Sequence, residues 1–294
     1  MVILSGPISY AQAVILGLLQ GFAELFPISS LGHSVILPQL LGWNIHQNDP
    51  YFITFLVATH LATAIVLLGF FWRDWVKVVH GMWRSLAERE ITPDNHYGRL
   101  GWLLVVGTIP AGAIGLLFQD SLRSAFASGK SAAFFLILNG FMLYGAERLR
   151  RRAPEQADSD PHRSDVRISE QIGYRHSVVI GAAQALALIP GFSRSGASMG
   201  GGLLVGLNNE DAARFSFLLA TPIIGAAAVL KLPDLFGSSG NGIRGPALAA
   251  SICAAVTAFL SVRFLVRYFE TNTMTPFAIY CVIAGAGSLA YLAL

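Results

Sequence analysis

Long apolar runs are the feature that most limits what this chain can fold into. A helix needs about 20 mostly apolar residues to cross the hydrocarbon core of a membrane. Six segments meet this requirement: 51–72, 100–118, 132–149, 212–231, 247–267 and 275–294. Only 13% of the residues are charged, whereas soluble domains carry about a quarter. The sequence therefore predicts an all-α, polytopic membrane protein, and nothing in it indicates a nucleic-acid partner.

Two further apolar segments, 10–42 and 174–207, are interrupted by proline, serine, glycine and ionisable residues. Backbone that is not helical at membrane depth is tolerated only where it is buried in protein or lines a polar cavity. We therefore expect these two segments to form re-entrant or broken helices and not ordinary spans.

The basic residues predict how the chain is oriented. The segments 73–99 and 147–175 are rich in arginine and lysine, whereas 119–131 and 231–246 carry two basic residues each. Because cytoplasmic loops carry the excess of basic residues, the two rich segments are predicted to be cytoplasmic. Within the second of them, residues 150–173 are polar and lack apolar periodicity, which predicts a flexible linker.

The two broken segments resemble each other at a shift of 164 residues. The matched residues are Gly17, Gln20, Ser29, Gly32 and Ser34 with Gly181, Gln184, Ser193, Gly196 and Ser198. With the predicted orientation, residues 1–149 and 174–294 form two repeats of opposite topology, joined by the linker. Such inverted repeats place their site near the middle of the membrane, where the broken helices meet.

The second broken segment has the chemistry of a phosphate site. Arg194 lies in the run GFSRSG at 191–196. Glycine lets the backbone approach a ligand closely, and a helix beginning there offers free amides to an anion. A guanidinium binds phosphate oxygens in bidentate fashion. We therefore expect a phosphate-binding site around Arg194, which includes Ser193, Ser195, Gly196 and Ser198.

The first broken segment supplies groups suited to hydrolysis. Ionisable residues inside a membrane are costly and are functional by default, and Glu24 and His33 are two of them. Ser30 can attack phosphorus while Glu24 or His33 takes its proton, or the same groups can activate a water; the residues leave both routes open. Glu24, together with Gln20 on the same helix face, is a candidate ligand of a divalent cation such as Mg²⁺ or Ca²⁺. For His60, in the next span, a structural role is the favoured interpretation.

Both segments resemble the motifs of the bacterial undecaprenyl-diphosphate phosphatase family, which is also known for bacitracin resistance. The matching stretches are QGFAELFPISSLGH at 20–33 and PGFSRSGAS at 190–198. The resemblance implies that Glu24 is the essential acid, Ser30 the nucleophile and His33 the catalytic histidine. It implies that Arg194 binds phosphate, and that Ser29, Ser193 and Ser195 are supporting hydroxyls.

The resemblance also implies a function and a location. We expect hydrolysis of undecaprenyl diphosphate to undecaprenyl phosphate and inorganic phosphate, which recycles the lipid carrier of peptidoglycan synthesis. The implied location is the bacterial plasma (inner) membrane, with a cavity open to the outer face, and the family commonly forms homodimers. Gln20 departs from the glutamate that many members carry, which weakens a two-carboxylate metal site; Leu31 and Ser198 replace threonines.

Two alternatives remain at this stage. Inverted repeats are typical of transporters, so a polyprenyl-phosphate flippase that uses the same midplane anion site is the main rival. A lipid phosphatase of another type, with Ser-Gly-His and Ser-Arg motifs, is disfavoured because it needs a histidine about six residues after its arginine, where this chain has Gly200.

Overall fold

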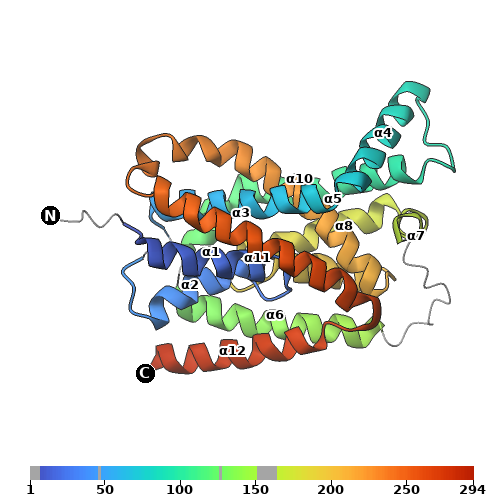
Figure 1. Cartoon of the computed structure of the whole chain (residues 1–294). Coiled ribbons are helices and arrows are strands. Elements are labelled where there is room, and N and C mark those ends of the chain that lie inside the picture. Colours follow the sequence, from blue (N-terminus) through green and yellow to red (C-terminus); the bar gives the residue numbers. More distant parts are fainter. Residues whose placement is uncertain (1–6, 46–47, 126–127, 151–163) are drawn as a thin grey trace.

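The computed structural model describes residues 7–45, 48–125, 128–150 and 164–294. In these ranges the chain is a bundle of helices joined by short connections, with six helices long and apolar enough to cross a membrane (Figure 1). The six are α3 (Pro50–Phe70), α5 (His96–Ala125), α6 (Gly129–Arg150), α10 (Asn209–Lys231), α11 (Arg244–Thr271) and α12 (Thr275–Ala293). They coincide with the six predicted spans, so the prediction of an all-α polytopic membrane protein is confirmed.

Each interrupted apolar segment forms a pair of short helices. Segment 10–42 contains α1 (Tyr10–Leu25) and α2 (Ser30–Leu40). Segment 174–207 contains α8 (Tyr174–Gln184), the 3₁₀ helix η2 (Ala185–Leu188) and α9 (Arg194–Leu204). The first helices of the two pairs begin 164 residues apart, and so do the second helices. In Figure 1, α1 begins at the left-hand end of the bundle and α8 at the right-hand end, so the pairs enter from opposite ends.

A buried asparagine joins the two breaks. Asn139 on α6 is fully buried, and its amide nitrogen donates to the carbonyl of Pro27, between α1 and α2, at 3.0 Å. Its side-chain oxygen accepts from the backbone N–H of Ser193, just before α9, at 3.0 Å. The hydroxyl of Ser195 adds a bond to the carbonyl of Phe26 at 3.1 Å. Three backbone groups of the non-helical breaks are thereby satisfied inside the protein, where the membrane interior offers no water to bond them.

Glycines let α1 and α8 pack closely on long helices. A β-carbon at Gly17 would lie 2.3 Å from the carbonyl oxygen of Ala250 on α11. At the repeat-related Gly181 it would lie 2.1 Å from the carbonyl oxygen of Gly107 on α5. Small residues at such crossings are typical of helix packing in membranes. The two broken pairs are therefore held firmly against the bundle by equivalent contacts.

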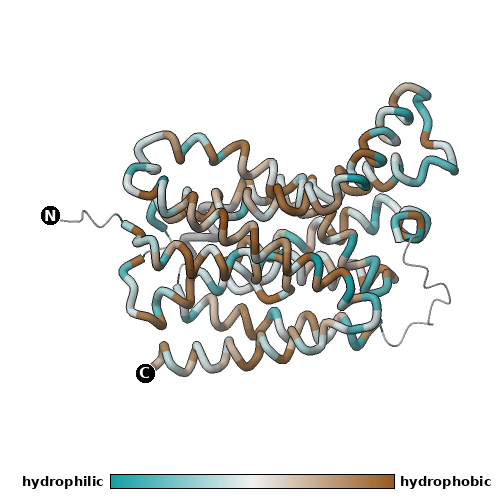
Figure 2. Tube along the Cα trace, in the orientation of Figure 1, coloured by the Kyte–Doolittle hydropathy of each residue, from teal (hydrophilic) through white to brown (hydrophobic). Residues whose placement is uncertain are grey.

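Two segments differ from the sequence-based expectation. The basic segment 73–99, expected to be a loop, contains α4 (Trp72–Glu88), which projects from one end of the bundle (Figure 1). The expected flexible linker 150–173 contains α7 (Ser164–Gln171), while residues 151–163 lie outside the described residues. Hydrophilic residues gather in these parts and in the loops at both ends (Figure 2).

Ion pairs, together with the fully buried Ile168, hold α7 against its neighbours. Arg214 on α10 contacts Asp165 at 2.6 Å and Asp74 on α4 at 3.0 Å. Arg167 on α7 contacts Asp211 on α10 at 2.8 Å. Arg214 and Asp211 lie 49 and 44 positions from their partners in α7, so local sequence patterns do not reveal these contacts. The prediction of a flexible segment was therefore wrong for residues 164–171.

Candidate active site

Two helix N-termini from opposite repeats meet at one place in the bundle. Ser29 and Ser193 are the N-cap residues of α2 and α9, and their hydroxyls accept from the backbone N–H groups of Gly32 and Gly196, each at 3.0 Å. The first residue of α2 is Ser30 and the first residue of α9 is Arg194. The fold thus directs two helix N-termini and one guanidinium toward the same region. Because the N-terminus of a helix attracts anions, this region is suited to an anionic ligand.

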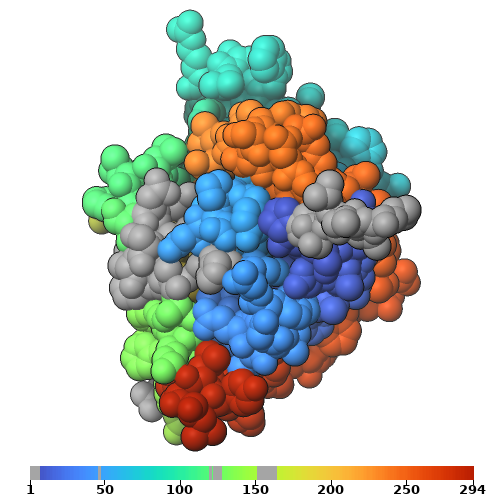
Figure 3. Space-filling model, turned by 90° about the vertical axis from the view of Figure 1, so that its left-hand side faces the viewer, coloured from blue at the N-terminus to red at the C-terminus, as the bar shows by residue number. Residues whose placement is uncertain are grey.

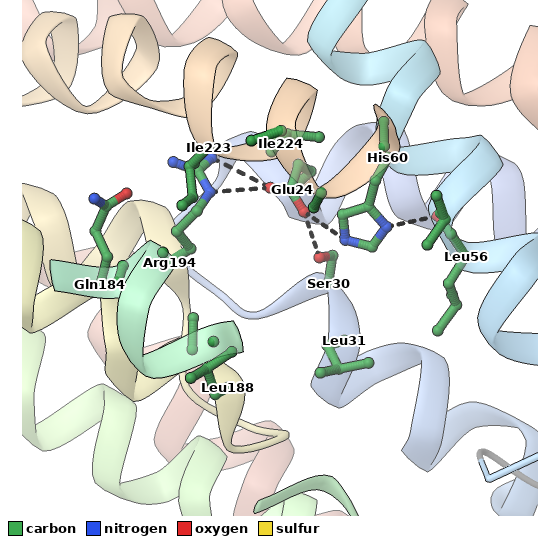
Figure 4. A pocket seen from close by; sticks show the side chains of 18 of the residues that line it. Glu24, Ser30, Leu31, Leu56, His60, Gln184, Leu188, Arg194, Ile223 and Ile224 are labelled. Carbon is green, nitrogen blue, oxygen red and sulfur yellow. Dashed lines mark hydrogen bonds and ion pairs between the residues drawn. The ribbon is translucent and has the colours of Figure 1, made fainter. Parts of the chain in front are cut away.

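Glu24, on the last turn of α1, is the centre of the site (Figure 4). One carboxylate oxygen accepts from the hydroxyl of Ser30 at 2.6 Å and from the amide of Gln20 at 3.1 Å. The other oxygen accepts from the Nε and Nη2 groups of Arg194 at 3.3 and 3.2 Å. The carboxylate is only 5% exposed. Groups from both repeats therefore converge on one buried negative charge.

His60 on α3 is also part of this site, contrary to the structural role favoured from the sequence. Its Nε2 lies 3.3 Å from the Glu24 carboxylate, and its Nδ1 bonds the carbonyl of Leu56 at 2.7 Å (Figure 4). Because a carbonyl only accepts, Nδ1 carries a proton. An ion pair with Glu24 therefore requires the doubly protonated ring. When the ring is doubly protonated, it and Arg194 place two cations around one carboxylate, and the net positive charge suits an anionic ligand.

A cavity of about 480 Å³ opens beside these groups. Its polar end is lined by Glu24, Ser30, His60, Ser193 and Arg194. Most of the remaining wall is apolar and comes from α3, α5, η2 and α10, with Lys231 at the end of α10. A few convergent polar groups in a mostly apolar cavity are typical of a ligand site, and this wall suits a ligand with a charged head and a hydrocarbon tail.

Gln184 is a second cavity residue that the sequence did not single out. It is the counterpart of Gln20 in the other repeat, is 2% exposed and lines the cavity. Its amide nitrogen donates to the carbonyl of Gly107 at 3.3 Å, while its buried oxygen has no partner in the structure. The repeat match of Gln20 with Gln184 was the signal that pointed to it.

The remaining predicted residues lie behind the cavity wall. Ser195 and Ser198 tie α9 to its neighbours; the hydroxyl of Ser198 is 2.6 Å from that of Ser216 on α10. Gly196 packs near Leu143 and Pro27, and Gln20 contacts the site through Glu24. Ser29 acts as the N-cap of α2. These residues shape the site without lining the cavity.

His33 also lies outside the cavity lining, although it is three residues after Ser30. Its Nδ1 bonds the carbonyl of Ser29 at 2.7 Å, and its Nε2 bonds the hydroxyl of Tyr280 on α12 at 2.8 Å. The two rings are stacked with centroids 5.7 Å apart. The structure thus places Ser30, but not His33, against Glu24.

The expected divalent cation does not fit a site made by the protein alone. Both oxygens of Glu24 already accept hydrogen bonds, and Gln20 presents its amide nitrogen, not its oxygen, to the carboxylate. Among the described residues there is no cluster of three or more His, Cys, Asp or Glu side chains suited to a metal.

Comparison with known proteins identifies close relatives over nearly the whole chain. A family model described as bacitracin resistance protein BacA matches residues 13–287. An undecaprenyl-diphosphatase of Mycolicibacterium paratuberculosis is 51% identical, with 98% of each chain covered. The undecaprenyl-diphosphatase of Granulibacter bethesdensis is 45% identical over 96% of each chain. A protein of Frankia alni named undecaprenyl-diphosphatase 2 is 44% identical over 95% of this chain and 96% of its own.

Proposed function

The chain belongs to the bacitracin resistance protein BacA family, and we propose that it hydrolyses undecaprenyl diphosphate to undecaprenyl phosphate and inorganic phosphate. The observation that carries the proposal is the contact between the Ser30 hydroxyl and the Glu24 carboxylate at 2.6 Å, beside Arg194, in an apolar-walled cavity. The family resemblance and the relatives' names supply the identity of the lipid, and the cavity supplies a fitting environment for it.

The diphosphate is bound by charge and by helix ends. Arg194 and the protonated ring of His60 supply positive charge beside the cavity, and α2 and α9 direct their N-termini toward it. The polyprenyl tail lies along the apolar wall formed by α3, α5 and α10. An incoming phosphate competes with Glu24 for the guanidinium, which frees the carboxylate to act on Ser30.

The hydroxyl of Ser30 is the nucleophile in this mechanism. Glu24 accepts its proton while Oγ forms a bond to the terminal phosphorus, and the bond from that phosphorus to the bridging oxygen breaks. Undecaprenyl phosphate leaves with the bridging oxygen and its electron pair. Arg194 stabilises the charge on the equatorial oxygens. A water then attacks the phosphorus of the phosphoserine, and the bond from phosphorus to Oγ breaks. Oγ takes back the proton that Glu24 holds, and inorganic phosphate leaves with both protons of the water.

The cavity is assigned to the outer face of the bacterial plasma membrane. Its wall includes the last residues of α10, next to the connection to α11, which is one of the two connections poor in basic residues. Figure 3 views the end of the bundle that carries this connection (orange, upper part) and the end of α12 (red, lower part), with segments of the first repeat (blue) between them. Diphosphate released on the outer side would enter from this end. The homodimer implied by the resemblance stays a prediction.

Phosphate release by Ser30→Ala tests the proposed chemistry. The purified variant should lose at least 100-fold in kcat, because it removes the attacking group. Ser34→Ala is the matched control: Ser34 is equally buried on α2 but does not line the cavity. Full activity in Ser30→Ala would assign the attack to a water. If Ser30→Ala loses hydrolysis but still binds the lipid, the result indicates an enzyme and not a protein that only transports the lipid as a flippase does.

A further inference from the structure

Ser29, the residue before the proposed nucleophile, has an unusual backbone. Its φ is 70° and its ψ is 94°, in a region that residues with a side chain rarely adopt. Among the described residues, only Arg89 is another non-glycine residue with a positive φ. Strain of this kind persists only where surrounding contacts hold it, and it gathers at functional sites.

The second repeat lacks this strain at the equivalent position. Ser193, the counterpart of Ser29, has the same N-cap role but an ordinary extended backbone, with φ −94° and ψ 126°. The unusual backbone is thus not required to begin the short helix. It is specific to the half of the molecule in which the first helical residue is Ser30 and not Arg194.

The second repeat also has no counterpart of the His33 side chain, which bonds the carbonyl of Ser29 in the first repeat. The carbonyl of Ser29 accepts from the backbone N–H of His33 at 3.2 Å and from its Nδ1 at 2.7 Å. The residue matching His33 is Ala197, whose backbone N–H alone bonds Ser193, at 2.8 Å. Strain and the additional side-chain bond therefore occur together in one repeat and are both missing from the other.

The two ring nitrogens of His33 are both engaged. A carbonyl only accepts, so Nδ1 carries the proton. In the neutral ring Nε2 then accepts from the hydroxyl of Tyr280 at 2.8 Å. With both nitrogens bonded to protein groups, and the ring outside the cavity lining, His33 has no free group to exchange a proton with a substrate.

We propose that His33, held by Tyr280, is a positioning residue that keeps the strained backbone of Ser29 and thereby aims the Ser30 hydroxyl at Glu24. This inference rests on the proposed nucleophilic role of Ser30. It replaces the catalytic role implied for His33 by the family resemblance. The chain of contacts runs from the Tyr280 hydroxyl through the His33 ring and the Ser29 carbonyl to the peptide bond that carries Ser30.

Steady-state hydrolysis of the C55 diphosphate by purified full-length variants tests this series of contacts from Tyr280 to Ser30. His33→Ala should lower kcat by about tenfold or more with KM nearly unchanged, because the nucleophile is misaligned while the phosphate site is intact. His33→Asn should recover much of kcat, since its amide nitrogen lies near the place of Nδ1. Tyr280→Phe should lower kcat less, and Tyr291→Phe, on an exposed tyrosine of the same helix, should not change it.

A double-mutant cycle separates positioning from proton transfer. Glycine adopts a positive φ without strain, so in a Ser29→Gly background the backbone depends less on His33. The loss caused by His33→Ala should therefore shrink severalfold in that background. An equal loss in both backgrounds, or an Asn variant as inactive as the Ala variant, would overturn positioning and favour direct catalysis by His33.

An experimental structure of His33→Ala gives an answer that does not depend on turnover. Ser29 should relax to a negative φ, like Ser193, and the Ser30 hydroxyl should move away from Glu24. If Ser29 keeps its positive φ and Ser30 its contact, the proposal is wrong even if hydrolysis falls. If the wild-type protein releases no phosphate at all, the proposed function fails, whereas this structural result still decides the role of His33.

Discussion

At the scale of single residues, the site is organised by one carboxylate that four helices share. Glu24 on α1 contacts Ser30 on α2, His60 on α3 and Arg194 on α9. A buried charge is tolerated only when it is paired and hydrogen-bonded, and these three partners are also groups that a diphosphate hydrolase can use. Stability and activity therefore depend on the same contacts.

Replacing His60 tests whether it belongs to this set. His60→Ala removes a cation beside the substrate and is expected to lower kcat/KM by roughly tenfold or more, as for other charged hydrogen bonds. His60→Gln keeps a donor toward Glu24 and should lose less. His80→Ala, on an exposed histidine of α4, is the control. A His60→Ala variant as active as the control would return His60 to the structural role favoured from the sequence.

The sequence predicted the central residues of the site that stand in motifs, and did not assign His60 or Gln184 to it. Glu24, Ser30 and Arg194 stand in the two broken segments, where a polar group interrupts an apolar run. His60 lies inside an otherwise regular span, so no motif marks it; the cost of an ionisable group in a membrane was the available signal. The direction of the His33 ring was beyond prediction, because it depends on Tyr280 nearly 250 positions away.

At the scale of helices, close contacts between backbones hold the broken pairs in place. Gly21 on α1 faces α11, and a β-carbon there would lie 2.1 Å from the carbonyl oxygen of Ala254 and from the hydroxyl of Thr257. The helix that carries Glu24 is thereby kept at a fixed distance from α11. The breaks and spans were predictable from apolar runs, whereas α7 was not, because it has no long apolar run and ion pairs with distant residues help to hold it.

Gly21→Ala should destabilise the protein, since the added methyl group overlaps backbone atoms. We expect a loss of about 1–3 kcal/mol, as for other overpacked sites, seen as a lower temperature of unfolding in detergent. Gly69→Ala is the matched control, because Gly69 on α3 has open space where the methyl group would lie. Equal unfolding temperatures for the two variants would mean that α1 and α11 are not packed this closely.

At the scale of the whole molecule, the predicted arrangement of two similar halves in opposite orientation would account for the meeting of Ser30 and Arg194 at Glu24. Each is the first residue of the second helix in its broken pair, 164 positions apart, and the predicted inversion would bring these two helix N-termini to a common site from opposite sides. The similarity of the halves was predictable from the shift of 164 residues, but the joining of the two breaks by Asn139 was not. That residue belongs to α6 and has no counterpart in either motif.

Labelling of single cysteines tests the orientation. In a background without Cys253 and Cys281, a membrane-impermeant maleimide should label Gly237→Cys, between α10 and α11, in intact cells. Glu90→Cys, after α4, should react only after the membrane is permeabilised. Both side chains would be exposed, since both residues lie at the surface. The reverse pattern would place the mouth of the cavity on the cytoplasmic side.

Both carboxylate oxygens of Glu24 accept hydrogen bonds from protein groups, so the substrate-free protein is expected to bind no cation there. Mg²⁺ titrated into the purified protein should give no saturable binding in calorimetry, because the carboxylate is already paired with two cations. Any loss of hydrolysis on adding EDTA would then come from cation bound to the diphosphate. Saturable binding that disappears in Glu24→Gln would instead establish a metal site at this residue.

The most direct test of the central claim is phosphate release from C55 diphosphate by the purified protein, compared with Arg194→Ala. The claim is that one buried site, shared by both repeats, performs the hydrolysis. It predicts steady release by the wild-type protein and a loss of at least 100-fold in the folded variant, because the charge on the transferring phosphoryl group is no longer stabilised. Comparable release by both proteins would contradict it.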